Sequence, residues 1–406
     1  MGAFMSRRIA IVLALTVLIV MVVVSPIAAQ DQFTFGMILV GPKNDHGWSQ
    51  AHYEAGQYAE SKVANSKMLV FESLNSADTP QSTVMSVATE MINEGAKLII
   101  TTSDDFQTDT TPTAAAFPNV TFVNMTGSTV LEGKAPANLS NYDAQLEWTE
   151  MINGCAAALT TKTGQIGYLG PLINDETRRL ASSAYLGAQY CYQKYAGGDA
   201  SKLKFTVTWI GFWFNLPGVT LDPTEEVNTF YDNGADVVIS AIDTTEALSV
   251  AAQRSAEGQK VYASGYDYKG TCDVAPDICI GVPYYNWGPY YERLVSGVKD
   301  GTWKQAWEWQ APDWKDINDP DTSSTGYMKG KALTDDNATK LDSFIKEMST
   351  FGSDPANKDR IFLWEGPLNY QDGTEFLAKD TFAKPLDIWY LPQLVQGMIG
   401  ASKTTS

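Results

Sequence analysis

Histidine, cysteine and basic residues are scarce in this chain. Its 406 residues include two His and four Cys, and 29 Lys and Arg stand against 47 Asp and Glu. The chain has two histidines, His46 and His52, and no pair of cysteines with zinc-finger spacing. We therefore expect no metal site and no cofactor. The formal net charge of −18 argues against nucleic acid, an anionic membrane surface or a highly anionic ligand as the partner.

Sequence motifs of catalysis are also missing. There is no Gly-x-Ser-x-Gly elbow and no Gly-x-x-x-x-Gly-Lys phosphate loop. The acidic residues are scattered, as on a solvated surface, although a pair of carboxylates remains an alternative catalytic device. We therefore do not expect an enzyme.

The first 29 residues have the features of a secretory signal peptide. Arg7 and Arg8 precede an uncharged apolar run, Ile9 to Val24, and small residues end the segment at Ala28 and Ala29. An uncleaved anchor is the alternative, but the run is a little short of the roughly 20 residues that a span needs. The signal peptide predicts an extracytoplasmic protein. Because no Cys directly follows the apolar run, we do not expect a lipoprotein.

Four cysteines in an exported chain permit disulfides. Cys272 and Cys279 flank a short loop rich in Asp and Pro, and we expect them to close it. Cys155 and Cys191 both fall in predicted helices and could pair across a lobe, but their spacing leaves this open.

Beyond Gln32, short apolar runs alternate with stretches of helical spacing. The predicted strands are Phe33–Val40, Lys67–Leu74, Leu98–Thr102, Thr121–Met125, Gln165–Leu169, Lys204–Ile210, Val237–Ala241, Lys260–Gly265, Ile278–Val282 and Ile361–Glu365. The predicted helices are Ser49–Ala64, Thr79–Glu94, Phe106–Phe117, Asp143–Lys162, Asn174–Tyr195, Pro223–Asn233, Thr244–Gly258, one from near Trp287, Asp335–Met348 and Ile388–Ile399. This order predicts an α/β protein with parallel sheets.

Several helix ends have recognisable signals. Thr79-Pro80 and Asp222-Pro223 each place a capping residue before a proline at the first helical position. Glycines that suit a left-handed residue just after a helix stand at 95, 164, 234 and 258. The polar stretch 127–141 interrupts the alternation and predicts a first crossing between two lobes, while the Trp-rich segment 303–321 allows no assignment.

The turn after the first predicted strand is the first candidate binding site. Gly41 and Pro42 end the strand, and the helical pattern begins near Trp48. Ligands of α/β sheets bind at the carboxyl ends of the strands, where a helix N-terminus also offers free N–H groups. We expect Asn44, Asp45, Trp48 and Gln50 to bind a flat ligand. The alternative is a capped helix with a core tryptophan.

Acidic, amide and aromatic residues recur after other predicted strands. The set is Asp105, Phe106, Trp213, Asp243, Asp267, Asn286 and Trp287. Singly, each could be a cap, a turn residue or part of the core. Together they predict a cleft in which aromatic rings sandwich a planar heterocycle and carboxylates accept hydrogen bonds from its edge.

Several motifs follow one another along the chain. They are Val40 to Gly56, Thr101-Thr-Ser103, Gly164-Gln-Ile-Gly-Tyr168, Gly234-Ala-Asp-Val-Val238, Gly265-Tyr-Asp267, Asn286-Trp-Gly-Pro-Tyr-Tyr291, Gly301-Thr-Trp303, Trp364-Glu-Gly-Pro367 and Asp387-Ile-Trp-Tyr390. In this order they resemble the basic membrane protein (BMP) family, the substrate-binding proteins of bacterial ABC importers for purine nucleosides and related compounds. The resemblance covers most of residues 33–400.

The resemblance implies a two-lobed type I periplasmic-binding-protein fold with three inter-lobe crossings. We expect one lobe from residues 31–140 plus 284–302 and the other from 141–283 plus 303–400. Asp45, Trp48, Trp213 and Asp267, with Phe106 or a neighbouring Asp, match ligand-contact positions of the family. Asn286-Trp287 stands near a point where other members place a ribose-binding Lys.

The expected function is capture of a purine base or nucleoside by a monomer that delivers it to an ABC permease. Three alternatives stay open. They are a sugar receptor of the same fold, a sensor domain for a signalling partner, and an enzyme acting on nucleosides.

Overall fold

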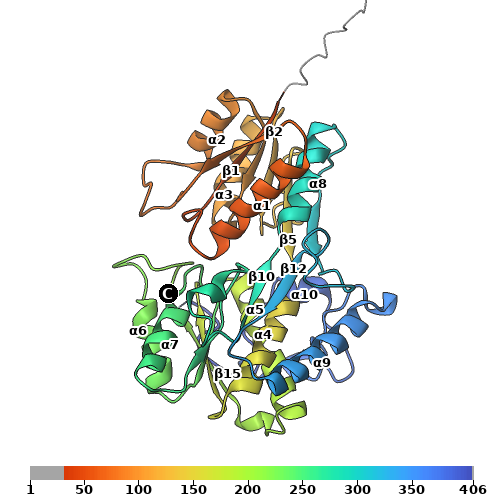
Figure 1. Cartoon of the computed structure of the whole chain (residues 1–406). Coiled ribbons are helices and arrows are strands. Elements are labelled where there is room, and N and C mark those ends of the chain that lie inside the picture. Colours follow the sequence, from red (N-terminus) through yellow and green to blue (C-terminus); the bar gives the residue numbers. More distant parts are fainter. Residues whose placement is uncertain (1–31, 405–406) are drawn as a thin grey trace, which may run out of the picture. The chain divides into compact units, whose positions relative to one another are not determined.

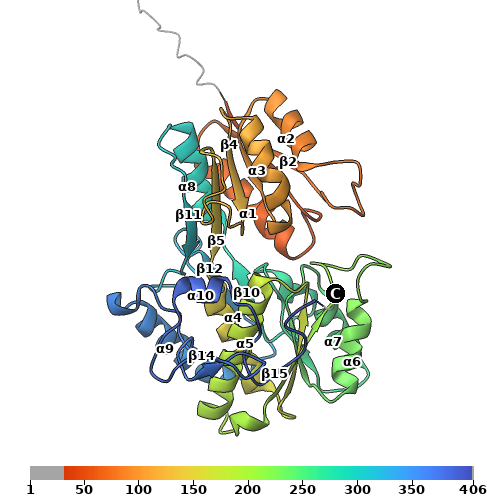
Figure 2. The same cartoon turned by 180° about the vertical axis from the view of Figure 1, so that it is seen from behind.

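Two parallel β-sheets organise residues 32–404, the part of the chain that the computed structural model describes (Figures 1 and 2). The predicted signal peptide lies outside these residues. The first sheet has the order β11-β5-β4-β3-β1-β2. Its strands are β1 (Phe33–Ile38), β2 (Ser66–Phe71), β3 (Ala96–Thr101), β4 (Thr121–Met125), β5 (Leu139–Ala144) and β11 (Trp307–Gln310).

The second sheet has the order β15-β7-β6-β8-β9, and all its pairings are parallel. Its strands are β6 (Gln165–Gly170), β7 (Lys204–Trp209), β8 (Val237–Ser240), β9 (Tyr262–Ala263) and β15 (Met398–Ile399). Near the C-terminus, β13 (Leu368–Asn369) and β14 (Glu375–Leu377) form a small antiparallel pair.

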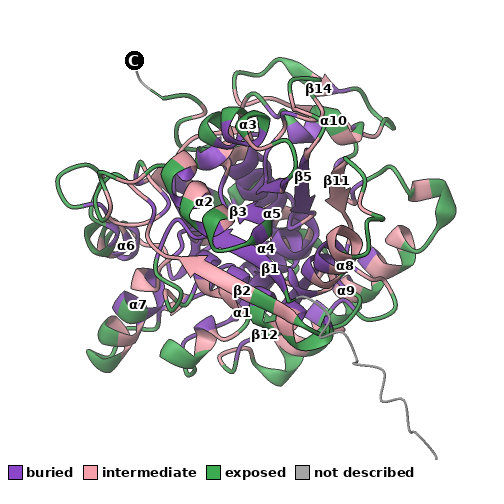
Figure 3. Cartoon of the chain, turned by 90° about the horizontal axis from the view of Figure 1, so that it is seen from above, coloured by how far each residue is buried: buried purple, intermediate pink, exposed green. Residues whose placement is uncertain are grey.

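Helices flank both sheets. Around the first sheet lie α1 (Trp48–Lys62), α2 (Val84–Asn93), α3 (Gln107–Ala116) and α8 (Gly288–Lys299). Around the second lie α4 (Glu147–Thr160), α5 (Asp175–Lys194), α6 (Pro223–Asp232), α7 (Glu246–Ala256), α9 (Asp335–Gly352) and α10 (Pro385–Trp389). Because helices cover both faces of each sheet, neither face of the central strands is exposed to solvent. All six residues of β1 are accordingly buried, and Figure 3 shows buried strands within a shell of helices with exposed outer faces.

The chain passes between the two sheets three times. The first passage is the junction of β5 and α4. The other two are β10 (Gly281–Tyr285), which leads to α8, and β12 (Thr325–Lys329), which leads to α9. These two strands pair antiparallel with each other. Helix α8 packs on α1, and α9 packs on α4, so each passage ends against a different sheet's helices.

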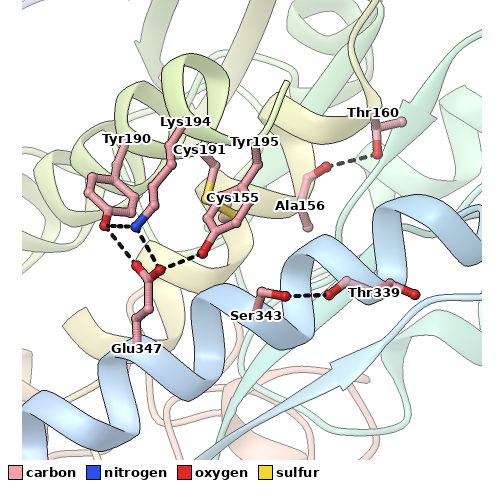
Figure 4. Close-up of a disulfide and its surroundings, with 10 residues drawn as sticks. All are labelled: Cys155, Ala156, Thr160, Tyr190, Cys191, Lys194, Tyr195, Thr339, Ser343 and Glu347. Atoms are coloured by element: carbon pink, nitrogen blue, oxygen red, sulfur yellow. Dashed lines mark hydrogen bonds and ion pairs between the residues drawn. A yellow bond between two sulfur atoms is a disulfide. The ribbon is translucent and has the colours of Figure 1, made fainter. Parts of the chain in front are cut away.

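Both disulfides lie in the second sheet's part of the chain. Cys155 of α4 is bonded to Cys191 of α5, the pairing that the spacing alone leaves open. Cys272 and Cys279 close the loop between β9 and β10, as expected. Beside the first disulfide, the Glu347 carboxylate of α9 accepts hydrogen bonds from the Nζ of Lys194 at 2.6 Å and the hydroxyl of Tyr195 at 2.8 Å (Figure 4). Covalent and polar contacts therefore bind α4, α5 and α9 into one cluster.

Most predicted elements are present, and several helix ends carry the predicted signals. Asp222 caps α6 by accepting the N–H of Thr224, and the four glycines after helices all have positive φ. The Thr79-Pro80 start of a helix is wrong. Helix α2 begins at Val84, because Thr83 and Ser86 form a reciprocal capping box there.

The C-terminal part departs furthest from the prediction. Residues 361–365 are not a strand, and the predicted helix 388–399 is reduced to α10, which ends at Trp389. Strands β5, β11 and β12 were not predicted. β11 pairs with β5 in the first sheet, although the segment 303–400 was assigned to the second lobe. The predicted first crossing at 127–141 is wrong, because this stretch connects β4 and β5, which are neighbours in the first sheet. The lobe boundaries otherwise stay a prediction. Between residues 32 and 404, no helix combines the length and the apolar character that a membrane crossing requires.

Candidate ligand-binding site

The loops that follow the strands of both sheets line one narrow pocket. It contains about 290 Å³ of space not filled by protein atoms, part of it open to solvent. The lining residues are Val40, Trp48, Ser103, Asp104 and Thr126 from the first sheet's loops, and Glu176, Trp213, Asp243, Tyr266 and Asp267 from the second sheet's part of the chain. The pocket thus lies where ligands of parallel sheets bind, at the carboxyl ends of the strands.

Trp48 is positioned by the turn that starts α1. The Asp45 carboxylate accepts the N–H groups of Gly47 at 2.9 Å, Ser49 at 2.9 Å and Gln50 at 3.0 Å, which fixes the first turn of the helix. The Trp48 indole N–H donates to the carbonyl of Thr102 after β3. These bonds hold the ring at the pocket wall, where it is 8% exposed.

Trp213 reaches the same pocket from the loop after β7. Its indole N–H donates to Oδ2 of Asp105 at 2.8 Å, and Asp105 lies after β3 in the first sheet. Burial raises the pKa of Asp105, while the hydrogen bond from Trp213 lowers it. The bond joins the two sheets' loops beside the pocket.

Other contacts close the gap between the two sets of loops. Asn174, the N-cap of α5, donates to Oδ2 of Asp104 at 3.0 Å. The hydroxyl of Thr271 donates to the carbonyl of His46 at 2.8 Å. Gly47 meets the backbone of Asp243 so closely that an added Cβ would lie 2.0 Å from its carbonyl oxygen. The two sets of loops are therefore in direct contact around the pocket.

Four carboxyl groups line the pocket, and those of Asp267 and Asp243 have no side-chain hydrogen bond within residues 32–404. Both oxygens of Asp267 are buried without a hydrogen bond, and the residue is 0% exposed. Oδ1 of Asp104 is likewise buried without a partner. Glu176 accepts only a long hydrogen bond of 3.4 Å from the Tyr285 hydroxyl. Asp267 also has a φ of 60°, a backbone conformation that is uncommon outside glycine and concentrated at functional sites.

Burial dominates the electrostatics of these acids. It raises the pKa values of Asp104, Asp243 and Asp267 well above that of an ordinary aspartate, and neighbouring carboxyl groups raise them further. Burial also raises the pKa of Glu176, against the opposing effect of Arg179. No Lys, Arg or His belongs to the pocket lining formed by residues 32–404.

The predicted site residues fall into two groups. Trp48, Trp213, Asp243 and Asp267 line the pocket, and Asp45 and Asp105 hydrogen-bond at its edge. The others do not line it. Asn44 is exposed, Gln50 bonds to the N–H of His46 and to Glu54, and Phe106 is buried after β3.

Asn286 and Trp287 serve the fold at β10 rather than the pocket. The Asn286 amide donates to the carbonyls of Pro320 at 3.0 Å and Ser323 at 2.7 Å and so holds the loop before β12. Trp287 is 1% exposed and stacks between His52, at 4.7 Å between ring centres, and Tyr285, at 4.3 Å.

The predicted set of site residues leaves out five lining residues that carry polar side chains: Ser103, Asp104, Thr126, Glu176 and Tyr266. A signal was available for most of them. Ser103 and Asp104 directly follow the predicted strand 98–102, and Tyr266 directly follows the predicted strand 260–265. Glu176 stands in the first turn of a predicted helix after the strand 165–169, a position where an acidic side chain is also a common helix-start residue.

The chemistry of the lining is that of recognition. Flat aromatic surfaces stand beside carboxylate oxygens, and the hydroxyls present are those of Ser103, Thr126 and Tyr266. A hydroxyl nucleophile needs an adjacent base, usually His, and no His belongs to the lining formed by residues 32–404, although its carboxyl groups could act as bases.

Comparison with known proteins gives the same picture. The model of the Bmp family, described as PnrA-like ABC transporter substrate-binding protein, matches residues 33–311. A purine-binding protein of Brucella abortus (strain 2308) is 27% identical over 350 residues, which cover 86% of this chain and 88% of that protein.

Solved structures share the fold at low sequence identity. An ABC transporter solute-binding protein from Aeropyrum pernix K1 aligns with a TM-score of 0.59 and 13% identity, over 78% of this chain and 86% of that one. One from Conexibacter woesei aligns with a TM-score of 0.56 and 15% identity, over 78% and 96%. The predicted type I periplasmic-binding-protein fold is confirmed.

Proposed function

We infer the function of this protein from one premise: the chain belongs to the Bmp family of PnrA-like ABC transporter substrate-binding proteins. We propose that it captures a purine base or a purine nucleoside outside the cytoplasm and delivers it, as a monomer, to an ABC permease. The relative from Brucella abortus is named as a purine-binding protein, which supports this choice of ligand.

One observation carries the proposal. Trp48 and Trp213 come from different sheets and line the same pocket, together with Asp243 and Asp267. Two indoles can stack on the faces of a planar ring, at about 1–3 kcal/mol per stacked base by analogy with nucleic-acid binders. Carboxylates between them can accept hydrogen bonds from the ring edge.

The proposed mechanism is closure of the two sheets' loops around the ligand. A ligand shifts a conformational equilibrium only by the difference between its affinities for the two forms. A ring held by both Trp48 and Trp213 makes its full set of contacts only when the loops meet. The Trp213–Asp105 hydrogen bond, at 2.8 Å, adds a protein–protein contact to the same form.

Ligand identification is the most direct test. We expect the purified protein to carry a purine that mass spectrometry of the denatured extract identifies. After removal of this ligand, calorimetry with adenine, guanine, hypoxanthine and their nucleosides should show saturable binding of at least one compound.

A matched variant tests the pocket assignment. Trp213→Ala should weaken that binding, whereas Trp307→Ala, which removes an indole from β11 outside the pocket lining, should not. Binding of glucose or ribose in the absence of purine binding would reject the proposal in favour of a sugar receptor. Release of free base from a nucleoside would point to an enzyme.

A further inference from the structure

The pocket presents hydrogen-bond acceptors that no protein group satisfies. Both oxygens of Asp267 and Oδ1 of Asp104 are buried and unpartnered among the described residues. A buried carboxylate without donors is strongly unfavourable, because it has lost its water and gained nothing in exchange. The lining therefore favours a ligand that donates hydrogen bonds.

No cation belongs to the lining formed by residues 32–404, although Arg179 behind it lowers the pKa values of Asp104 and Glu176. Arg179 is the buried cation on α5, and its guanidinium is already engaged by Oε1 of Glu147 at 2.6 Å and Oδ2 of Asp143 at 2.7 Å. Its flat face lies 4.2 Å from the ring centre of Trp389. The acids Asp45, Glu150, Glu176 and Asp243 raise the pKa of Asp267, which in turn raises the pKa values of the phenols Tyr168, Tyr266 and Tyr285.

Donors for an acceptor-rich ligand are scarce in the same lining. The indole N–H of Trp48 is used by the carbonyl of Thr102, and that of Trp213 is used by Asp105. The hydroxyl of Thr126 donates to the carbonyl of Met125 at 2.7 Å. The pocket lining therefore has many hydrogen-bond acceptors and few free hydrogen-bond donors.

We propose that this pocket selects planar rings whose edge is a cationic or N–H-rich amidine or guanidine group, with Asp267 as the main partner of that edge. The inference rests on the proposed function and narrows it within the purines. A carboxylate accepts two parallel N–H bonds from such an edge, which fixes orientation as well as energy. An oxo-substituted edge instead turns its lone pairs toward Asp104, Asp243 and Asp267 and is accepted only where one of these acids keeps its proton, whereas a cationic or N–H-rich edge stabilises the ionised carboxylate.

Two purines of nearly equal size separate the alternatives. Diaminopurine carries two amino groups where xanthine carries two oxo groups. Titration calorimetry of the full-length mature protein at pH 7 should give diaminopurine an affinity at least about 100-fold higher than that of xanthine, as expected for two exchanged hydrogen bonds to charged groups. Benzamidine, a flat amidinium without a purine ring, should bind measurably.

The substitution Asp267→Asn tests the residue itself. Asn has the same shape as Asp and tolerates the same positive φ, so we expect the fold to persist, with thermal melting as the check. The variant should lose most of the 100-fold preference, because its amide can donate to an oxo group. Asp273→Asn removes one charge from an exposed position in the same loop region and should leave the preference unchanged.

The outcomes distinguish this inference from the proposed function. If purines bind but xanthine binds as tightly as diaminopurine, the donor-rich selection is wrong and the purine receptor stands. If no purine binds while benzamidine does, the purine assignment fails and the selection by acids stands. Should Asp267→Asn not fold, the ligand series on the unmodified protein still decides.

Discussion

Gly47 offers a sharp test of the proposed closure. A Cβ at this position would lie 2.0 Å from the carbonyl oxygen of Asp243 and 2.7 Å from its carbonyl carbon. Real Cβ contacts are almost never shorter than 3.0 Å, and both atoms belong to the backbone, which cannot turn aside. Gly47→Ala should therefore force the two sets of loops apart by about 1 Å or more.

This separation breaks the hydrogen bonds that join the loops. The Trp213–Asp105 bond is 2.8 Å long and the Asn174–Asp104 bond is 3.0 Å long, so a rigid opening of that size takes both beyond hydrogen-bonding distance. Each bond has a carboxylate acceptor and contributes about 1.5–3 kcal/mol. The closed form should lose about 3–6 kcal/mol, which weakens ligand binding by about 100-fold or more.

Titration calorimetry with diaminopurine measures the loss, and small-angle X-ray scattering with saturating ligand measures the closure. Gly297→Ala is the matched control, since the nearest atom to its added Cβ is at 3.7 Å. The variant should melt near the temperature of the unmodified protein, because the clash exists only in the closed form. Unchanged affinity together with an unchanged radius of gyration in Gly47→Ala would refute the closure mechanism.

Further expectations concern the ligand site, the charges and the disulfide. Trp213→Ala should weaken purine binding by about 10- to 100-fold in calorimetry, since one stacked ring face contributes about 1–3 kcal/mol. Folding raises the pKa of Asp267, so its contribution to stability is greatest below the unfolded pKa and is lost as pH rises through the folded pKa; the melting temperature of the ligand-free protein should fall from pH 5 to pH 8, and Asp267→Asn should reduce that fall. Arg179→Met should destabilise the fold by about 3–5 kcal/mol in urea unfolding, because it leaves buried carboxylates without their cation; stability equal to the unmodified protein would contradict this. Replacing Cys155 and Cys191 by Ala, which opens a loop with a sequence separation of 36, should lower the free energy of unfolding by about 4 kcal/mol.

Local signals explain where the fold was predictable from the sequence. The runs that form β1, β3, β4 and β6 are mostly buried on both faces, so each reads as a largely apolar segment. Asp222 before Pro223 signals a helix start, and the helix does begin there. At Thr79 the same pattern fails, because the capping box of Thr83 and Ser86 satisfies the helix end further along.

Elements defined by distant partners were beyond local reasoning. β11 contains two tryptophans and two polar residues, and it is a strand because it pairs with β5, more than 150 residues earlier in the chain. β15 has only Met398 and Ile399, which are held by β7. Such short segments have no periodicity of their own, and tertiary pairing decides their conformation.

The candidate site was predictable by its place rather than by its full membership. The rule that ligands bind after parallel strands leads to Trp48, Trp213, Asp243 and Asp267. The same rule also admits Trp287, whose position after β10 resembles the others. β10 lies in neither main sheet but passes between them, so its end is packed inside the molecule. Only the sheet topology separates the two cases.

The left-handed backbone at Asp267 limits which residues can replace it, and therefore how ligand selectivity at this position can change. With φ near 60°, a longer or branched side chain strains the main chain, whereas Asn and Gly fit at little cost. Two substitutions therefore cost little at this position: Asn, whose amide tolerates oxo groups, and Gly, which leaves space for a bulkier ligand. Either exchange would change the ligand selectivity of the pocket while leaving both sheets as they are.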